Sequence, residues 1–148
     1  MGQRRVKPPA EWANIYGKLT NSAPGNVKNE ATAVGVVFGD AAALKAMRKR
    51  VTSREAAAPR REALQTLLAA KDPELVKTLQ ALLGDTALRE AALAGLAMYD
   101  DSQTPRMILA TYPSLSASEK RAALATLASR SPYGQELLKA VADKQVPK

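Results

Sequence analysis

A pattern of leucines and basic residues recurs about every 30 residues along this 148-residue chain. If Leu64, Leu93 and Leu124 are taken as equivalent, a second leucine lies three residues after each, and a base lies four residues before each. The second leucines are Leu67, Leu96 and Leu127, the bases are Arg60, Arg89 and Lys120, and the residues eight positions after the first leucines are Asp72, Asp101 and Pro132. A period near 30 residues indicates stacked helical hairpins, each of which buries its apolar face only against the next.

A partial copy of the same pattern lies earlier in the chain. Lys28 and Asp40 keep the separation of Arg60 from Asp72 and of Arg89 from Asp101, although Thr32 and Gly35 replace the two leucines. Twelve residues span roughly 18 Å along a helix, too far for contact within one repeat. The base of one repeat is therefore predicted to meet an acid of the adjacent repeat. The predicted ladder consists of Lys28, Asp40, Arg60, Asp72, Arg89 and Asp101.

Ala and Leu are the commonest residues, whereas Phe and Trp occur once each, and this composition favours helix over strand. Prolines and capping residues divide the chain into about nine short helices. Helix starts are predicted at Pro8-Pro9, Val27, Asp40, Pro59, Asp72-Pro73-Glu74, Gly84-Asp85, Thr104-Pro105, Ser116 to Glu119 and Ser131-Pro132. Trp12 and Tyr16 lie on the apolar stripe of the first helix and are interpreted as the buried face of an end-capping helix.

The chain contains neither Cys nor His, which excludes thiolate nucleophiles, imidazole bases and Cys/His metal sites. The acidic residues near Asp72 and Asp101 are interpreted as helix caps rather than as catalytic carboxylate pairs. We therefore expect no enzymatic activity and no cofactor. No stretch approaches the roughly 20 apolar residues of a membrane-spanning helix, so no membrane insertion is expected.

The net charge of +8 lies entirely in the first part of the chain. Residues 1–61 contain 12 basic and 4 acidic residues, whereas residues 62–148 contain 10 of each. The densest run forms a candidate basic patch of Lys45, Arg48, Lys49, Arg50, Arg54, Arg60 and Arg61. Lys45, Arg48 and Lys49 are expected to face solvent, opposite a stripe of Leu44, Met47 and Val51.

This patch has two interpretations. It is either a solvated surface, some of whose arginines pair with acids of neighbouring repeats, or a surface that attracts acidic proteins, phosphate backbones or anionic lipid head groups. Tyr99, Tyr112 and Tyr133 lie in the neutral part of the chain, so base stacking beside the patch is not indicated.

The segment from Arg60-Arg61-Glu62-Ala63-Leu64 to Lys71-Asp72-Pro73 resembles a HEAT-like repeat. Some HEAT-like solenoids are DNA glycosylases that hold duplex in a basic groove, so the resemblance implies nucleic-acid binding as the alternative function. More narrowly, Ala91 to Asp101, Thr104-Pro105, Tyr112 to Ser116 and Ala125 to Arg130 resemble part of large planctomycete- and verrucomicrobial-type proteins. Those proteins combine a membrane-bound dehydrogenase-like propeller and HEAT repeats with a haem-binding cytochrome domain. Any propeller or haem ligands would lie outside this sequence.

The resemblance implies an all-α, right-handed α-solenoid of about four HEAT-like hairpins. Residues 1–26 are expected to form a cap or partial repeat, and residues 27–148 the repeats. The expected function is a non-catalytic scaffold or protein-interaction module, a segment of a larger redox-associated protein that is periplasmic or exported. The expected partners are another protein or neighbouring domains of the parent chain.

Overall fold

The computed structural model describes residues 7–146, and this part of the chain is helical without strands. The predicted all-α class is therefore confirmed. Nine α-helices and two 3-10 turns, η1 and η2, follow one another within the described residues: α1 Trp12–Ser22, α2 Gly25–Phe38, α3 Ala41–Val51, α4 Ala57–Ala69, α5 Leu75–Ala81, η1 Leu82–Gly84, α6 Arg89–Leu96, α7 Thr104–Thr111, η2 Tyr112–Ser114, α8 Ala117–Ala128 and α9 Ser131–Ala142.

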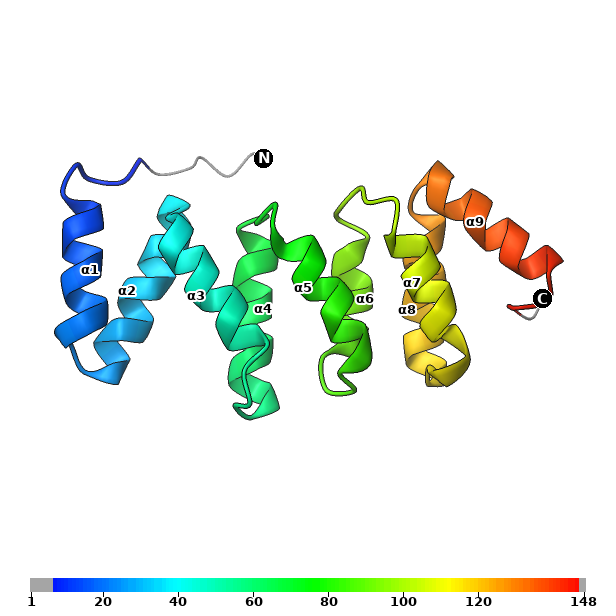
Figure 1. Ribbon diagram of the computed structural model, residues 1–148, viewed down its shortest axis with the longest axis horizontal. Coiled ribbons are helices and arrows are strands. Elements are labelled where there is room, and N and C mark those ends of the chain that lie inside the picture. The colour runs from blue at the N-terminus through cyan, green and yellow to red at the C-terminus, as the bar shows by residue number, and fades with distance from the viewer. Residues whose placement is uncertain (1–6, 147–148) are drawn as a thin grey trace. The chain divides into compact units, whose positions relative to one another are not determined.

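The chain forms two compact units, an N-terminal unit, Met1–Asp72, and a C-terminal unit, Pro73–Lys148. The N-terminal unit contains α1 to α4, and each of these helices packs on the next one along the chain (Figure 1). Helix α2 also contacts α4, so alternate helices of this unit lie against each other.

Aromatic side chains join α1 to α2 in the N-terminal unit. The Trp12 ring stacks on Tyr16 with centroids 5.7 Å apart and meets Phe38 edge-on at 4.8 Å. Tyr16 is buried, as expected for the core face of the first helix. Helix α3 buries Ala43, Met47 and Val51 at positions four residues apart, so the predicted apolar stripe of this helix is confirmed at Met47 and Val51.

Gly35 explains why the earliest copy of the repeat lacks a leucine at this position. A Cβ added at Gly35 would lie 2.6 Å from Cβ of Ala43 and 3.3 Å from the Trp12 ring. Helix α2 therefore approaches α3 and α1 more closely than any side chain at position 35 would allow. Thr32, which replaces the other leucine, uses its hydroxyl to hydrogen-bond the Lys28 carbonyl one turn earlier.

In the C-terminal unit, α6 packs against α8 and α7 packs against α9, so alternate helices again lie side by side. The repeat leucines Leu93, Leu96 and Leu127 are fully buried, whereas Leu124 is half-buried. Between α6 and α8, the buried Thr126 hydroxyl donates to the Leu93 carbonyl at 2.7 Å. The leucine periodicity thus marks the helix faces that form this core.

Several helix starts agree with the local sequence signals. The Asp40 carboxylate accepts a hydrogen bond from the Ala43 backbone N–H, and Gly39 before it adopts φ 71°, which ends α2. Ser116 and Glu119 form the predicted capping box of α8. The prolines after Thr104 and Ser131 lie in the first turns of α7 and α9.

Other predicted starts are wrong by two to five residues. The first helix begins at Trp12 rather than at Pro9, whose carbonyl accepts from the Trp12 N–H. The fourth begins at Ala57, before Pro59. The fifth begins at Leu75 because Pro73 and Glu74 form a turn, while Asp72 turns its carboxylate to a distant arginine. The sixth begins at Arg89, one turn after Asp85.

Candidate functional site

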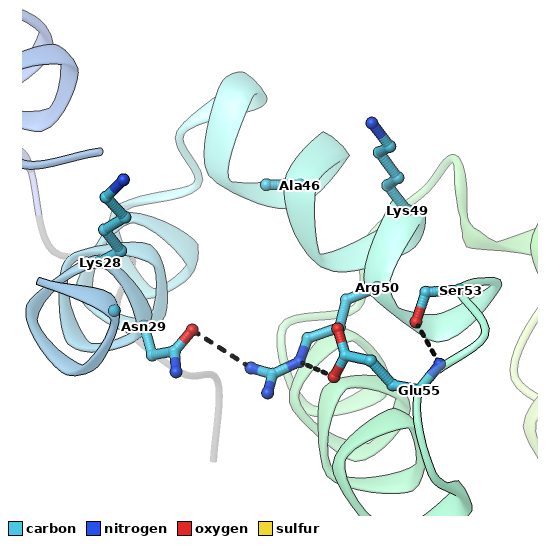
Figure 2. Close-up of a pocket in the computed structure, with 8 residues that line it drawn as sticks. Lys28, Asn29, Ala46, Lys49, Arg50, Ser53 and Glu55 are labelled. Atoms are coloured by element: carbon cyan, nitrogen blue, oxygen red, sulfur yellow. Dashed lines mark hydrogen bonds and ion pairs between the residues drawn. The ribbon is translucent and has the colours of Figure 1, made fainter. Parts of the chain in front are cut away.

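An open pocket of about 510 Å³ lies in the N-terminal unit, between the first turns of α2, the outer face of α3 and the loop that follows α3. Eight residues line it, and cations and polar side chains predominate among them (Figure 2): Gly25, Lys28, Asn29, Ala46, Lys49, Arg50, Ser53 and Glu55. They come together because α2 and α3 pack side by side and the loop turns back towards α2.

Arg50 is held in place at this pocket by two neighbours. Its Nε donates to Glu55 Oε2 at 3.1 Å, and its terminal nitrogen Nη1 donates to Asn29 Oδ1 at 3.4 Å. Glu55 is positioned in turn by its own backbone N–H, which donates to Ser53 Oγ at 3.3 Å. The guanidinium group therefore has a defined orientation between α2 and the loop, as Figure 2 shows.

Lys28 and Lys49 extend from α2 and α3 on the two sides of Arg50 (Figure 2). Among the residues that the structure describes, neither ammonium group has a hydrogen-bond or ion-pair partner. The lining thus carries three positive charges, from Lys28, Lys49 and Arg50, and one negative charge, from Glu55. The net charge of +2 makes the pocket electrostatically favourable for an anion.

The predicted basic patch contains four exposed residues and three half-buried ones, which are Arg48, Arg50 and Arg60. Lys45, Lys49, Arg54 and Arg61 are exposed, in agreement with a solvated face. Arg48 does not face solvent as expected: its side chain is only 17% exposed and its Nη1 contacts Asp72 Oδ2 at 2.5 Å. Helix α3 therefore presents lysines outward and uses Arg48 to hold the segment after α4.

Arg60 and the equivalent Arg89 stabilise the end of the preceding helix. Nε of Arg60 donates to the carbonyl of Val51, the last residue of α3, at 2.8 Å. Nε of Arg89 donates to the Leu83 carbonyl in η1 at 2.7 Å. Lys120, at the third equivalent position, lies over the Tyr112 ring in η2. Cations at helix C-termini satisfy free carbonyls and complement the helix dipole, so these bases have structural roles.

The ladder acids share a contact that the sequence did not reveal. Asp40 accepts a hydrogen bond from Nε1 of Trp12 at 3.2 Å, and Asp101 accepts one from Nε2 of Gln80 at 2.7 Å. With the Arg48–Asp72 contact, each acid accepts from a helix of the preceding hairpin: α1, α3 and α5 in turn. The sequence did not reveal these donors because they are of three different residue types. They also lie at different separations from their acids, 28, 24 and 21 residues.

Arg89 forms an ion pair between neighbouring repeats, and its partner is Glu119. Its Nη1 lies 3.6 Å from Glu119 Oε1, which joins α6 to α8. The sequence predicted contacts between a base and an acid of the next repeat, and the Arg89–Glu119 ion pair is a contact of this kind. Nothing in the sequence indicated this partner, because Glu119 was assigned only to the capping box. Lys28 has no ion-pair partner among the described residues, and Arg89 pairs with Glu119 rather than with a ladder acid. The pairing of Arg60 with a ladder acid of an adjacent repeat stays a prediction.

The pKa values of two carboxyl groups in the C-terminal unit, Glu119 and Glu136, are lowered by neighbouring groups. The hydrogen bond from the Ser116 backbone lowers the pKa of Glu119, with a smaller contribution from Arg89. The hydrogen bond from Lys139 lowers the pKa of Glu136. Residues 7–146 contain no group of three acidic side chains placed to hold a metal ion, and no helix among them has the length and apolarity to cross a bilayer.

Comparisons with protein-family models, with curated proteins and with solved structures found no match to this chain. The pocket and the exposed cations beside it are therefore interpreted from their own geometry and charge.

Proposed function

We propose that this chain is a non-catalytic interaction module built from HEAT-like helical hairpins. Its exposed cations in the N-terminal unit bind an acidic segment, carried by a partner protein or by a neighbouring domain of a longer parent chain. In the family that the sequence resembles, such a parent is a large, exported, redox-associated protein.

The recurring aspartate contact supports the HEAT-like part of this proposal. Asp40, Asp72 and Asp101 occupy equivalent positions, and each accepts from a side chain one hairpin earlier. Alternate helices also pack together within each unit, α2 with α4 and α6 with α8. An acid at the same position of each repeat that contacts the preceding hairpin fits stacked hairpins, since each repeat touches mainly its neighbours.

The exposed cations that lack internal partners carry the binding part of the proposal. Lys45, Lys49 and Arg54 are exposed, and none of them has a hydrogen bond or ion pair among the described residues. Lys45 and Lys49 are four residues apart and share one face of α3. A cluster of uncompensated positive charge accelerates the encounter with an acidic partner and disfavours basic ones.

The placement of the aromatic residues favours an acidic protein over nucleic acid. Trp12 packs on both Tyr16 and Phe38, and Tyr112 and Tyr133 are buried in the C-terminal unit. Recognition of single-stranded nucleic acid generally uses exposed aromatic rings for base stacking. Duplex binding through phosphates alone is the alternative, and the experiment below discriminates between the two.

The experiment measures fluorescence anisotropy of a labelled glutamate-rich peptide and of a labelled random duplex, each titrated with the protein at about 50 and about 200 mM salt. We expect saturable peptide binding that weakens with salt. The triple variant Lys45→Glu, Lys49→Glu, Arg54→Glu should lose it. A control with the same net charge, Lys18→Glu, Lys77→Glu, Arg121→Glu, changes exposed residues elsewhere and should retain it.

Absence of peptide binding at about 50 mM salt would overturn the proposal, and so would equal losses in the two triple variants. Tighter binding of the duplex than of the peptide would identify nucleic acid as the partner instead.

A further inference from the structure

The pocket between α2 and α3 differs from the rest of the basic surface because it is concave and contains an arginine that is hydrogen-bonded on two sides. Arg50 is fixed by Glu55 and Asn29, while Lys28 and Lys49 flank it without internal partners. A volume of about 510 Å³ is within the range of pockets that take small molecules, roughly 300 to 1,000 Å³. The site is therefore suited to one compact ligand group.

The net charge of the residues that line the pocket favours a ligand with two negative charges. Three cations and one carboxylate leave +2, which a dianion neutralises and a single carboxylate does not. A phosphate monoester carries about −1.5 to −2 charges at pH 7 and has three strong acceptor oxygens.

The donors around the pocket also suit a phosphoryl group. Lysine ammonium groups bind phosphate as mobile point charges, and four rotatable bonds allow Lys28 and Lys49 to fold over a ligand. The Ser53 hydroxyl accepts from the Glu55 backbone N–H, which leaves its own O–H able to donate.

We infer that this pocket, lined by Lys28, Lys49 and Arg50, is a binding site for the dianionic phosphoryl group of a phosphate monoester. The site shares Lys49 with the surface proposed above for an acidic segment but differs from it otherwise, because Lys45 and Arg54 do not line the pocket. Free inorganic phosphate and an organic monoester share the chemistry that the pocket would recognise.

The absence of histidine makes pH a direct probe of this inference. No side chain type in the protein ordinarily titrates between pH 5.5 and 7.5, because the chain has neither His nor Cys. A phosphate monoester loses its second proton near pH 6. A change of affinity over this interval therefore reports the charge of the ligand.

The experiment follows backbone amide signals of the ¹⁵N-labelled full chain during titrations at constant ionic strength. Phenyl phosphate is the probe, phenyl sulfate is a control of similar shape with one charge, and inorganic phosphate tests the free anion. We expect saturating shifts at Asn29, Ser53 and Glu55, and affinity about two- to threefold higher for phenyl phosphate at pH 7.5 than at pH 5.5, because about a quarter of the ester is already dianionic at pH 5.5. Phenyl sulfate should bind about fivefold more weakly than phenyl phosphate at pH 7.5, with no pH dependence.

Variants separate the pocket from general surface charge. Lys28→Gln and Lys49→Gln should each weaken phenyl phosphate binding about fivefold, whereas Lys18→Gln, an exposed lysine on α1, should leave it unchanged. Lys45→Glu with Arg54→Glu should weaken the acidic peptide far more than phenyl phosphate, so the two proposals fail separately.

Two results would overturn the inference. One is a set of shifts spread over surface lysines without saturation, with Lys18→Gln as damaging as Lys49→Gln. The other is equal binding of phenyl sulfate and phenyl phosphate at pH 7.5. Two other results support the site and identify what it recognises. If inorganic phosphate binds as tightly as the ester, the pocket recognises the phosphoryl group alone. If the ester binds more tightly, the organic group also contributes to binding.

Discussion

Replacing Gly35 by alanine is predicted to destabilise the N-terminal unit, although alanine is the better helix former. The helix preference alone would stabilise α2 by about 1 kcal/mol. The new Cβ, however, would lie 2.6 Å from Cβ of Ala43, where carbon atoms prefer about 3.5 to 4.0 Å.

The clash at Gly35 is costly because the neighbouring atom has no freedom to move away. Ala43 is fully buried, and its Cβ moves only with the backbone of α3, so α2 and α3 must separate by about 1 Å. Overpacking of this kind costs about 1 to 3 kcal/mol, and a rigid neighbour places this case at the upper end. After the helix preference is subtracted, we expect a net loss of about 2 kcal/mol in the free energy of unfolding.

Gly17→Ala is the matched control for this prediction. Gly17 lies inside α1, and a Cβ added there meets no atom within 4 Å. The same substitution should therefore stabilise the unit by up to about 1 kcal/mol. The same glycine-to-alanine change should therefore lower the free energy of unfolding at position 35 and raise it at position 17. The two variants should differ from each other by about 3 kcal/mol.

Urea denaturation followed by tryptophan fluorescence measures both variants. Trp12 is the chain's single tryptophan and lies in the N-terminal unit, so its signal reports the unit that carries both glycines. A Gly35→Ala midpoint equal to or above that of the wild type would refute the close approach of α2 and α3 described here.

Two further predictions concern the C-terminal unit. Glu119 has a lowered pKa, so its ionised form stabilises the fold above its ordinary pKa of 4.5, and this contribution disappears as the pH falls through the lower folded value. Glu119→Gln should therefore lower the free energy of unfolding by about 1 kcal/mol at pH 7, and this loss should shrink towards pH 3.5. Urea unfolding followed by circular dichroism measures both values. An equal loss at both pH values would contradict the role of the ionised Glu119 carboxylate. Thr126→Val should lower the free energy of unfolding by about 1 to 2 kcal/mol, because it leaves the buried Leu93 carbonyl without its donor. Thr126→Ser keeps the hydroxyl and serves as the control. Greater thermal stability of the valine variant than of the serine variant would be evidence against this hydrogen bond.

Local signals predicted the helix boundaries well where the capping side chain bonds to its own helix. Asp40 caps α3, and Ser116 with Glu119 caps α8, because in each case donor and acceptor are three residues apart in the sequence. The prediction was wrong at Asp72, whose carboxylate contacts Arg48 from 24 residues earlier. A distant donor does not by itself remove a cap, because Asp40 caps α3 with one carboxylate oxygen while the other accepts from Trp12.

The candidate pocket was only partly visible in the sequence. Lys49 and Arg50 belong to the predicted basic patch, and Lys28 was assigned to a ladder. Asn29, Ser53 and Glu55 carried no signal, since nothing in their spacing shows that they face the same space. They meet only because Gly35 allows α2 to lie close against α3.

The helical class and most of the leucine positions in the core follow from local features of the sequence. Helix propensity, short-range caps and the spacing of leucines act within one or two turns, so they can be read from neighbouring residues. The partners of the long polar side chains, by contrast, depend on how the helices pack. Arg48, Lys49 and Arg50 are consecutive cations, yet one holds Asp72, one extends into solvent and one is fixed by Glu55 and Asn29. Each points in a different direction around the helix, and the packing of the other helices decides what each one meets.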